Sequence, residues 1–391
     1  MTDSEKYVLT LCESSFLNLW CFPNPIGKKK KELCDILVVC GTHVLIFSVK
    51  EIEINPTGNF ELDNSRWLKR AVDDSIKQIY GAERIIKTGI SIVDSFSEET
   101  ILLPELANCQ IHRIAISLGR GNDYSLKFGD FGKGFVHVFD EATLDVIFNE
   151  LSTITDFINY LNEKEYQVSQ NNIPLLYSEK DLLAFYLLNG RSLEINGDEN
   201  QDKTIIFEND IWDGLTQDEH YLELKKFQIS SVYWDKILDE FLFTFDRDEL
   251  IVPMKRNQLD KSIFYLALES RHNRVVLGQA IKEFINPKPG TFNTSRITHS
   301  PNNRKIIYVF LLRDASSSDR MLILDELQLR LYVAREILGE GDIAIGIGMD
   351  SENSAGYSYD LCTMDFSDWT KEDSKYSQQI QSQLGFYKQT K

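Results

Sequence analysis

The spacing of apolar residues predicts a β-hairpin near the amino terminus. Residues 36–39 and 44–49 form two apolar, β-branched runs, and residues 40–43 between them contain Gly41. A glycine beside polar residues marks a turn. The pattern therefore predicts two buried antiparallel strands joined by a short connection.

Polar and charged residues stand at the ends of this predicted hairpin. Asp35 precedes the first strand, Lys50 ends the second, and Ser48 comes two residues before Lys50. In an antiparallel pair, the start of one strand lies beside the end of the other, so we expect these three residues to meet at one edge. Because side chains alternate along a strand, Ser48 and Lys50 should share a face. A purely structural ion pair between Asp35 and Lys50 is the alternative interpretation.

A helix is predicted before the hairpin, over residues 4–20. Its apolar residues form one stripe, ended by the prolines at positions 23 and 25. Glu5 falls near the middle of the stripe and Glu13 at its edge. Both glutamates can be solvated helix charges. If one of them has another role, Glu5, on the buried face, is the first choice and Glu13 the second.

A second helix is predicted after the hairpin, over residues 66–88. Gln78 lies on the face that carries small and apolar residues, where its amide needs hydrogen-bonding partners. Basic residues recur at helical spacing on another flank of this helix: Arg66, Arg70, Lys77 and Arg84. A core hydrogen bond for Gln78 and a solvated face for the basic residues are the alternatives.

The remaining pattern predicts an α/β protein in three regions. Strands at 111–118 and 135–139 and a helix at 142–162 complete the first region, residues 1–165, as a mixed sheet flanked by helices. Residues 174–286 form a mostly helical, acidic middle region, with Trp212 and Trp234 as expected packing anchors and a long helix at 259–284. Residues 296–391 show the order strand, helix, strand, strand, helix, which predicts a small carboxyl-terminal α/β domain.

The order Asp35, then Ser48-Val49-Lys50 on the next strand, resembles the core of the PD-(D/E)XK nuclease superfamily. The resemblance covers residues 1–165 and implies a restriction-endonuclease-like fold. It departs from the superfamily pattern at Ser48, where a glutamate or aspartate is more usual. This departure puts metal occupancy and activity in question.

The resemblance also implies roles for the residues singled out above. Asp35 and Glu5 would hold Mg²⁺ or Mn²⁺ together with the backbone carbonyl of Val49, since hard cations prefer oxygen ligands. Lys50 would stabilise negative charge during attack of water on phosphorus, and Ser48 and Gln78 would complete the catalytic set. The helix that carries Gln78 would face the nucleic acid through its basic residues: Arg66, Arg70, Lys77 and Arg84.

Composition limits these inferences. The 391 residues carry a formal net charge of −18, which disfavours a protein whose main role is to grip nucleic acid but permits a local basic face. Residues 28–31 are four consecutive lysines that either follow a phosphate backbone or form a solvated loop. The six cysteines lack CxxC spacing, and no signal peptide or membrane span is indicated. We therefore expect a cytoplasmic protein without a zinc site.

These observations favour a metal-dependent endonuclease that acts on DNA rather than RNA, as an effector of bacterial anti-phage or restriction-type defence. The defence context follows from the resemblance alone. The middle and carboxyl-terminal regions would regulate the nuclease, form a homo-oligomer or dock a protein partner. The alternative is a non-catalytic scaffold or interaction subunit with a degenerate nuclease fold.

Overall fold

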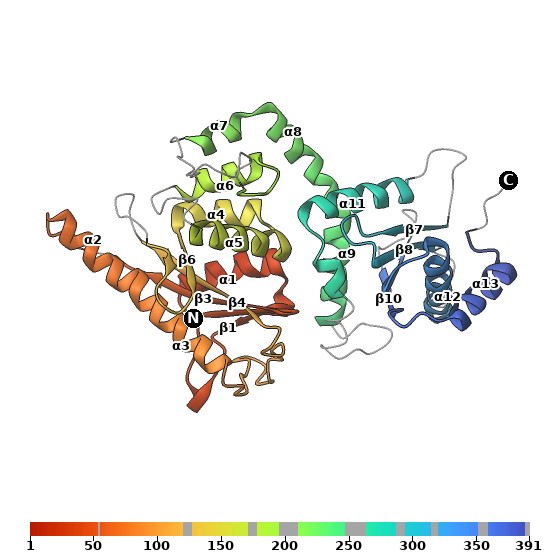
Figure 1. Ribbon diagram of the computed structural model, residues 1–391, viewed down its shortest axis with the longest axis horizontal. Coiled ribbons are helices and arrows are strands. Elements are labelled where there is room, and N and C mark those ends of the chain that lie inside the picture. Colours follow the sequence, from red (N-terminus) through yellow and green to blue (C-terminus); the bar gives the residue numbers. More distant parts are fainter. Residues whose placement is uncertain are drawn as a thin grey trace. The chain divides into compact units, whose positions relative to one another are not determined.

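The computed structural model describes residues 1–53, 55–119, 127–170, 178–194, 210–246, 263–286, 294–313, 320–350 and 359–387. It divides into two compact units, Met1–Leu222 and Glu223–Lys391. Each unit contains a β-sheet with helices packed on it (Figure 1). The predicted mixed α/β class with a helix-flanked sheet is confirmed at this level. The finer division of the chain into three regions, 1–165, 174–286 and 296–391, remains a prediction.

The first unit is built on a mixed sheet of six strands in the order β1-β2-β3-β4-β6-β5. Strands β3, β4 and β6 run parallel, whereas β1, β2 and β5 are antiparallel to their neighbours. The strand bounds are β1 Cys21–Pro23, β2 Ile36–Cys40, β3 His43–Glu51, β4 Gln110–Leu118, β5 Gly129–Asp130 and β6 Phe135–Asp140.

Strands β2 and β3 form the predicted hairpin. Ile36 pairs with Phe47 and Cys40 pairs with His43, which leaves Gly41 and Thr42 as a two-residue turn. Gly41 has φ 57°, a left-handed conformation that glycine adopts without steric cost.

Helices cover both faces of this sheet. Helix α2 (Phe60–Leu68), the π-helical turn η3 (Lys69–Asp73) and α3 (Asp74–Ile86) pack on the face that carries Leu37 and Ile46. Helices α1 (Asp3–Phe16), α4 (Glu141–Glu150) and α5 (Ile154–Ser169) cover the other face (Figure 1). Phe16 joins α1 to this layer, because its ring lies 5.5 Å from that of Phe148 and 5.0 Å from that of Phe157.

Three predicted helix bounds in this unit are wrong. Helix α1 ends at Phe16, since Leu17 adopts φ 71°, and the chain continues through η1 (Asn18–Trp20) into strand β1. The second helix begins at Phe60, because the Asn59 side chain caps it. The predicted helix at 142–162 is two helices, with Thr153 capping the start of α5. The shorter elements of the unit are η2 (Lys28–Lys30), α6 (Glu179–Leu188) and α7 (Ile211–Gln217).

The second unit contains a four-stranded sheet in the order β10-β9-β8-β7, in which β8 and β9 are parallel. Its strands are β7 (Ser295–His299), β8 (Ile306–Arg313), β9 (Ile343–Asp350) and β10 (Tyr359–Asp365). Its helices are η4 (Ile229–Ser231), α9 (Val232–Asp246), α11 (Arg271–Ile285), α12 (Arg320–Leu338) and α13 (Lys371–Leu384), and α8 (Glu219–Gln228) spans the boundary between the units.

Two findings modify the prediction for this unit. Helix α11 begins at Arg271 because the Ser270 side chain caps it, so one continuous helix over 259–284 is wrong. Strand β7 was not predicted. Trp234 is fully buried as expected, whereas Trp212 is half-buried. All six cysteines are free thiols, and among the described residues no helix is long and apolar enough to cross a bilayer.

Two histidines touch at the start of the parallel strands. His43 Nδ1 lies 3.1 Å from His112 Nε2. Burial of His112, together with the nearby positive charges of His43 and Arg113, lowers its pKa to about 3. The folded protein therefore holds this imidazole neutral at pH values where the unfolded chain protonates it.

This difference predicts a loss of stability in acid. A folded-state pKa near 3, below the ordinary value of 6.5, means that the unfolded chain binds more protons as the pH falls through this window. We expect this one group to lower the free energy of unfolding by about 2 kcal/mol between pH 7 and pH 5. Urea unfolding of the wild type and of His112→Gln at both pH values measures it. The variant should lose less stability on acidification, while His220→Gln, on the exposed surface of α8, should behave as wild type. Equal losses in all three proteins would contradict the assignment.

Candidate functional site

The carboxylate of Asp35 is buried at the edge of the hairpin, with 2% of the residue exposed. The Asp35 N–H donates to Phe47 O at 3.2 Å, which places Asp35 level with Ser48. Its Oδ2 accepts the Val49 N–H at 2.5 Å and lies 3.4 Å from Lys50 Nζ. Its Oδ1 accepts from Gln78 Nε2 at 2.8 Å. A buried charge is tolerated only when it is paired and hydrogen-bonded, and these donors satisfy that condition.

Ser48 and Gln78 form a relay that ends on Asp35. The Ser48 hydroxyl, fully buried, donates to Gln78 Oε1 at 2.8 Å, and the Gln78 amide then donates to Asp35. An ionised carboxylate can only accept, so it fixes the orientation of the amide. Helix α3 presents Gln78 on the same face as the buried Ser75 and Ala82, as its spacing predicts. The structure thus brings Asp35, Ser48, Lys50 and Gln78 together.

A cavity of about 520 Å³ opens beside this cluster. It is lined by Thr2, Ser4, Glu5, Val49, Lys50, Glu51 and Glu53. The cavity lies at the carboxyl end of β3, which runs parallel to β4. Ligands of open α/β sheets commonly bind in the crevice outside the carboxyl ends of the strands. Lys50 links the two features, because its amine contacts Asp35 and its side chain lines the cavity.

The structure places Glu5, and not Glu13, at this cavity. Glu5 lies in the first turn of α1, where its carboxylate accepts the Thr2 N–H at 2.8 Å and completes a capping box. Glu13 is half-buried elsewhere on α1, and burial raises its pKa. Of the two candidates from the first helix, only Glu5 shares the cavity with Lys50.

Glu32 was missed by the sequence analysis. Burial, the charge of Asp35, a hydrogen bond between the two carboxyl groups and the charge of Glu5 together raise the pKa of Glu32, and Lys50 partly opposes them. A backbone bridge between Ile26 and Glu32 closes the loop that carries the lysine run, and this bridge brings Glu32 back toward the site. The sequence feature that could have identified Glu32 is an acidic residue directly after the four lysines and three residues before Asp35.

The donors at this site suit a hard divalent cation. The carboxylates of Asp35, Glu5 and Glu32 and the carbonyl of Val49 carry oxygen atoms, the ligand type that hard cations prefer. Burial first, and then the charges of Asp35 and Glu5, raise the pKa of Glu32, and a bound cation would oppose this shift. The described residues contain no group of three or more His, Cys, Asp or Glu side chains gathered closely enough to hold a metal.

The predicted basic residues are exposed along the helix that carries Gln78. Arg66, Arg70, Lys77 and Arg84 all lie on the outer surface of α2–α3, which runs as one long rod in Figure 1. Lys77 pairs with Asp74 at 2.7 Å, and this hydrogen bond lowers the pKa of Asp74. The charges of Lys69 and Lys50 contribute to the same shift. The four lysines at 28–31 are also exposed.

Comparison with known proteins gives no assignment. Neither the protein-family models, nor the curated proteins, nor the solved structures contain a match to this chain.

The relay through Gln78 predicts a measurable coupling. Gln78→Leu removes one donor from the buried Asp35 and the acceptor of Ser48, so we expect a loss of about 1–3 kcal/mol in the free energy of unfolding. Urea unfolding at pH 7 measures it. Lys77→Ala, the exposed neighbour on the same helix, should change stability by about 0.5 kcal/mol or less.

A double-mutant cycle with Ser48→Ala tests the relay itself. In the Gln78→Leu background, Ser48→Ala should cost clearly less than in the wild type, since its partner is already gone. Strictly additive losses would show that the two side chains do not act together.

Proposed function

We propose that the first unit is a metal-dependent endonuclease that hydrolyses DNA phosphodiester bonds through the site around Asp35. The observation that carries the proposal is a buried carboxylate held by Gln78 and the Val49 amide, with the amine of Lys50 at 3.4 Å on the wall of a cavity. An acid and an amine in this arrangement supply a cation ligand and a charge-stabilising group side by side. The resemblance of Asp35 and Ser48-Val49-Lys50 to the PD-(D/E)XK pattern supports the same chemistry.

Each residue of the cluster has a distinct part in this proposal. Asp35, Glu5 and the Val49 carbonyl would hold Mg²⁺ or Mn²⁺, which supplies Lewis-acid polarisation of the phosphate when bound. Gln78, backed by Ser48, keeps the Asp35 carboxylate in one orientation. Lys50 is partly exposed, so its ammonium can reach a phosphate oxygen and stabilise the charge that grows there in the transition state.

Substrate binding would use the exposed basic surface on α2–α3. The chain as a whole is acidic, with a formal net charge of −18, so attraction of a polyanion has to come from a local surface. Arg66, Arg70, Lys77 and Arg84 provide such a surface, and the lysines at 28–31 add to the positive charge of the unit. A role in bacterial anti-phage or restriction-type defence is proposed from the superfamily resemblance alone.

A non-catalytic scaffold is the second candidate, and one observation favours it. The position where the superfamily usually carries an acid is Ser48, whose buried hydroxyl is already engaged by Gln78. The acidic and carboxyl-terminal parts of the chain would then hold a protein partner or a second copy of the chain. The experiment below separates the two candidates.

Cleavage of plasmid DNA in the presence of Mg²⁺ or Mn²⁺ tests the proposal. We expect Asp35→Asn and Lys50→Ala each to lower the cleavage rate by about 100-fold or more, as loss of a transition-state contact does. The matched controls are Asp3→Asn and Lys6→Ala, which disrupt an exposed ion pair of the same residue types at 3.0 Å on α1 and should cleave as wild type.

Folding of every variant is checked by thermal unfolding, and single-stranded DNA and RNA are tested in parallel. Faster cleavage of RNA than of DNA would reassign the substrate. Absence of cleavage of all three nucleic acids by the wild type would reject the nuclease and support the scaffold.

A further inference from the structure

The long helix that carries Gln78 contains one π-helical turn, η3, between α2 and α3. In this turn the Asp74 N–H donates to Lys69 O, five residues earlier rather than four. A π turn holds one extra residue, and such turns frequently lie at functional sites. This one ends at Asp73, shortly before Gln78, which donates to Asp35.

The spacing of buried residues explains why the extra residue is needed. Buried positions recur every four residues across η3: Asp63, Trp67, Ala71, Ser75 and Ile79. An α-helix repeats every 3.6 residues, so over four such steps this stripe would drift by about 160° around a regular helix. The extra residue of a π turn removes about 100° of the drift. Trp67 of α2 and Ile79 of α3 can therefore pack in the same core.

Two serines hold the backbone at this turn. The Ser75 hydroxyl donates to Ala71 O at 2.8 Å, and the Ser117 hydroxyl, near the carboxyl end of β4, donates to the same carbonyl at 3.4 Å. Both serines are fully buried, where a hydroxyl without a partner would be costly. Ser75 belongs to the helix itself, so the contact from Ser117 is the one that ties the turn to the sheet.

Ser117 is also a neighbour of the Asp35 cluster. It pairs with Lys50 across β3 and β4, and Ala115 pairs with Ser48. Because side chains alternate along a strand, Ser117 lies on the same face as Ala115, which packs in the core beneath α2–α3. The residue that holds the turn is therefore fixed beside the strand that carries Ser48 and Lys50.

The rotation of α3 about its axis decides whether Gln78 reaches its partners. Its amide lies 2.8 Å from Asp35 Oδ1 and 2.8 Å from the Ser48 hydroxyl. A side-chain tip lies about 5–6 Å from a helix axis, so a rotation of about 20° displaces it by about 2 Å. Hydrogen bonds of this length do not survive such a displacement.

We propose that Ser117 is a positioning residue for the Asp35 site. Through the Ala71 carbonyl it fixes the π turn, and thereby the rotation of α3 that brings Gln78 to Asp35 and Ser48. The effect on catalysis rests on the proposed nuclease function, whereas the position of Gln78 can be measured without it.

Nitrogen-15 NMR of the full-length protein tests this assignment. The side-chain amide resonance of Gln78 is identified as the one that Gln78→Leu removes. Ser117→Ala should shift this resonance, because the turn loses its bond to β4, and thermal unfolding verifies that the variant is folded. An unshifted Gln78 resonance in a folded Ser117→Ala would overturn the assignment.

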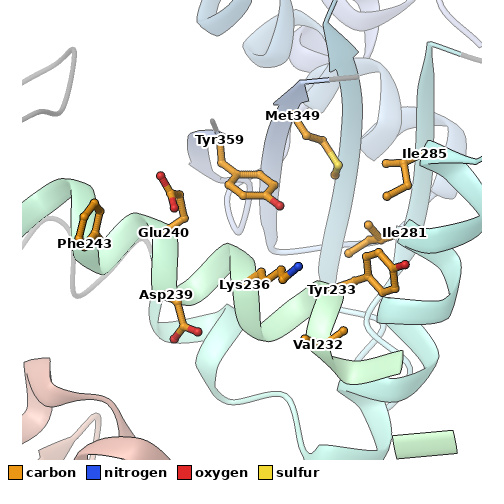
Figure 2. Close-up of a pocket in the computed structure, with 10 residues that line it drawn as sticks. All are labelled: Val232, Tyr233, Lys236, Asp239, Glu240, Phe243, Ile281, Ile285, Met349 and Tyr359. Carbon is orange, nitrogen blue, oxygen red and sulfur yellow. The ribbon is translucent and has the colours of Figure 1, made fainter. Parts of the chain in front are cut away.

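Two substitutions in the second unit control for loss of stability alone. Ser377 is fully buried on α13 and donates to Tyr332 O of α12 at 3.0 Å, so Ser377→Ala removes a bond of the same kind. Ile281 is 2% exposed and, with Lys236, lines a cavity of about 610 Å³ between α9, α11, β9 and β10 (Figure 2). Ile281→Val should lower stability about as much as the loss of one hydrogen bond does. Both controls should leave the Gln78 resonance at its wild-type position, and shifts equal to that of Ser117→Ala would overturn the positioning role.

Plasmid cleavage separates positioning from a general structural effect. Ser117→Ala should lower the rate by about tenfold or more, because small displacements near a reacting centre are costly. In the Gln78→Leu background it should have no further effect, since its route to the site is already removed. Equal losses in both backgrounds would overturn the route through Gln78. If the wild type cleaves no nucleic acid, the nuclease proposal fails, and the NMR measurement still decides the role of Ser117.

Discussion

The buried carboxylate of Asp35 is the feature on which the site in the first unit depends. Removing a charge from water is costly, and here the cost is offset by donors from the β3 backbone, from Lys50 and from Gln78. The hairpin supplies the first two donors, and α3 supplies the third. Hairpin and helix must therefore be in register before the carboxylate is satisfied, which couples the packing of one sheet face to the geometry of the site.

The surroundings of Asp35 are more acidic than one lysine can balance. Glu5, Glu51 and Glu53 line the adjoining cavity, and Glu32 approaches Asp35 closely enough for the two carboxyl groups to share a hydrogen bond. An excess of oxygen ligands around a single ammonium is a suitable environment for a cation. The exposed basic residues of α2–α3 lie outside this acidic centre. In the proposed nuclease, the acidic centre would hold the metal and the basic residues would contact the phosphates.

In the second unit, charged side chains connect secondary-structure elements to one another. Asp235 is bound by Arg271 and Arg274, and Glu269 accepts from Tyr308 at 2.7 Å and from Asn273 at 2.6 Å. The contacts of Asp235 join α9 to α11, and Glu269, which lies just before α11, joins that helix to β8.

Local periodicity was sufficient to predict the hairpin, the shared face of Ser48 and Lys50, and the inward position of Gln78. Alternation along a strand and the turn of a helix are properties of the backbone, so a short stretch of sequence contains them. The end of α1 at Phe16 could not be predicted in this way. Leu19 and Trp20 continue the apolar stripe, and the helix stops because Cys21–Pro23 pairs with β2, a contact between distant residues.

Local spacing could not predict the approach of Glu32 to Asp35 or the cavity beside Lys236 either. The first depends on a loop closed by the bridge from Ile26, and the second on four elements separated along the chain. The sequence by itself therefore determined which residues face inward on each element. Only the tertiary structure decided which of these faces meet, because long-range pairing and packing have no signature in the local spacing of residues.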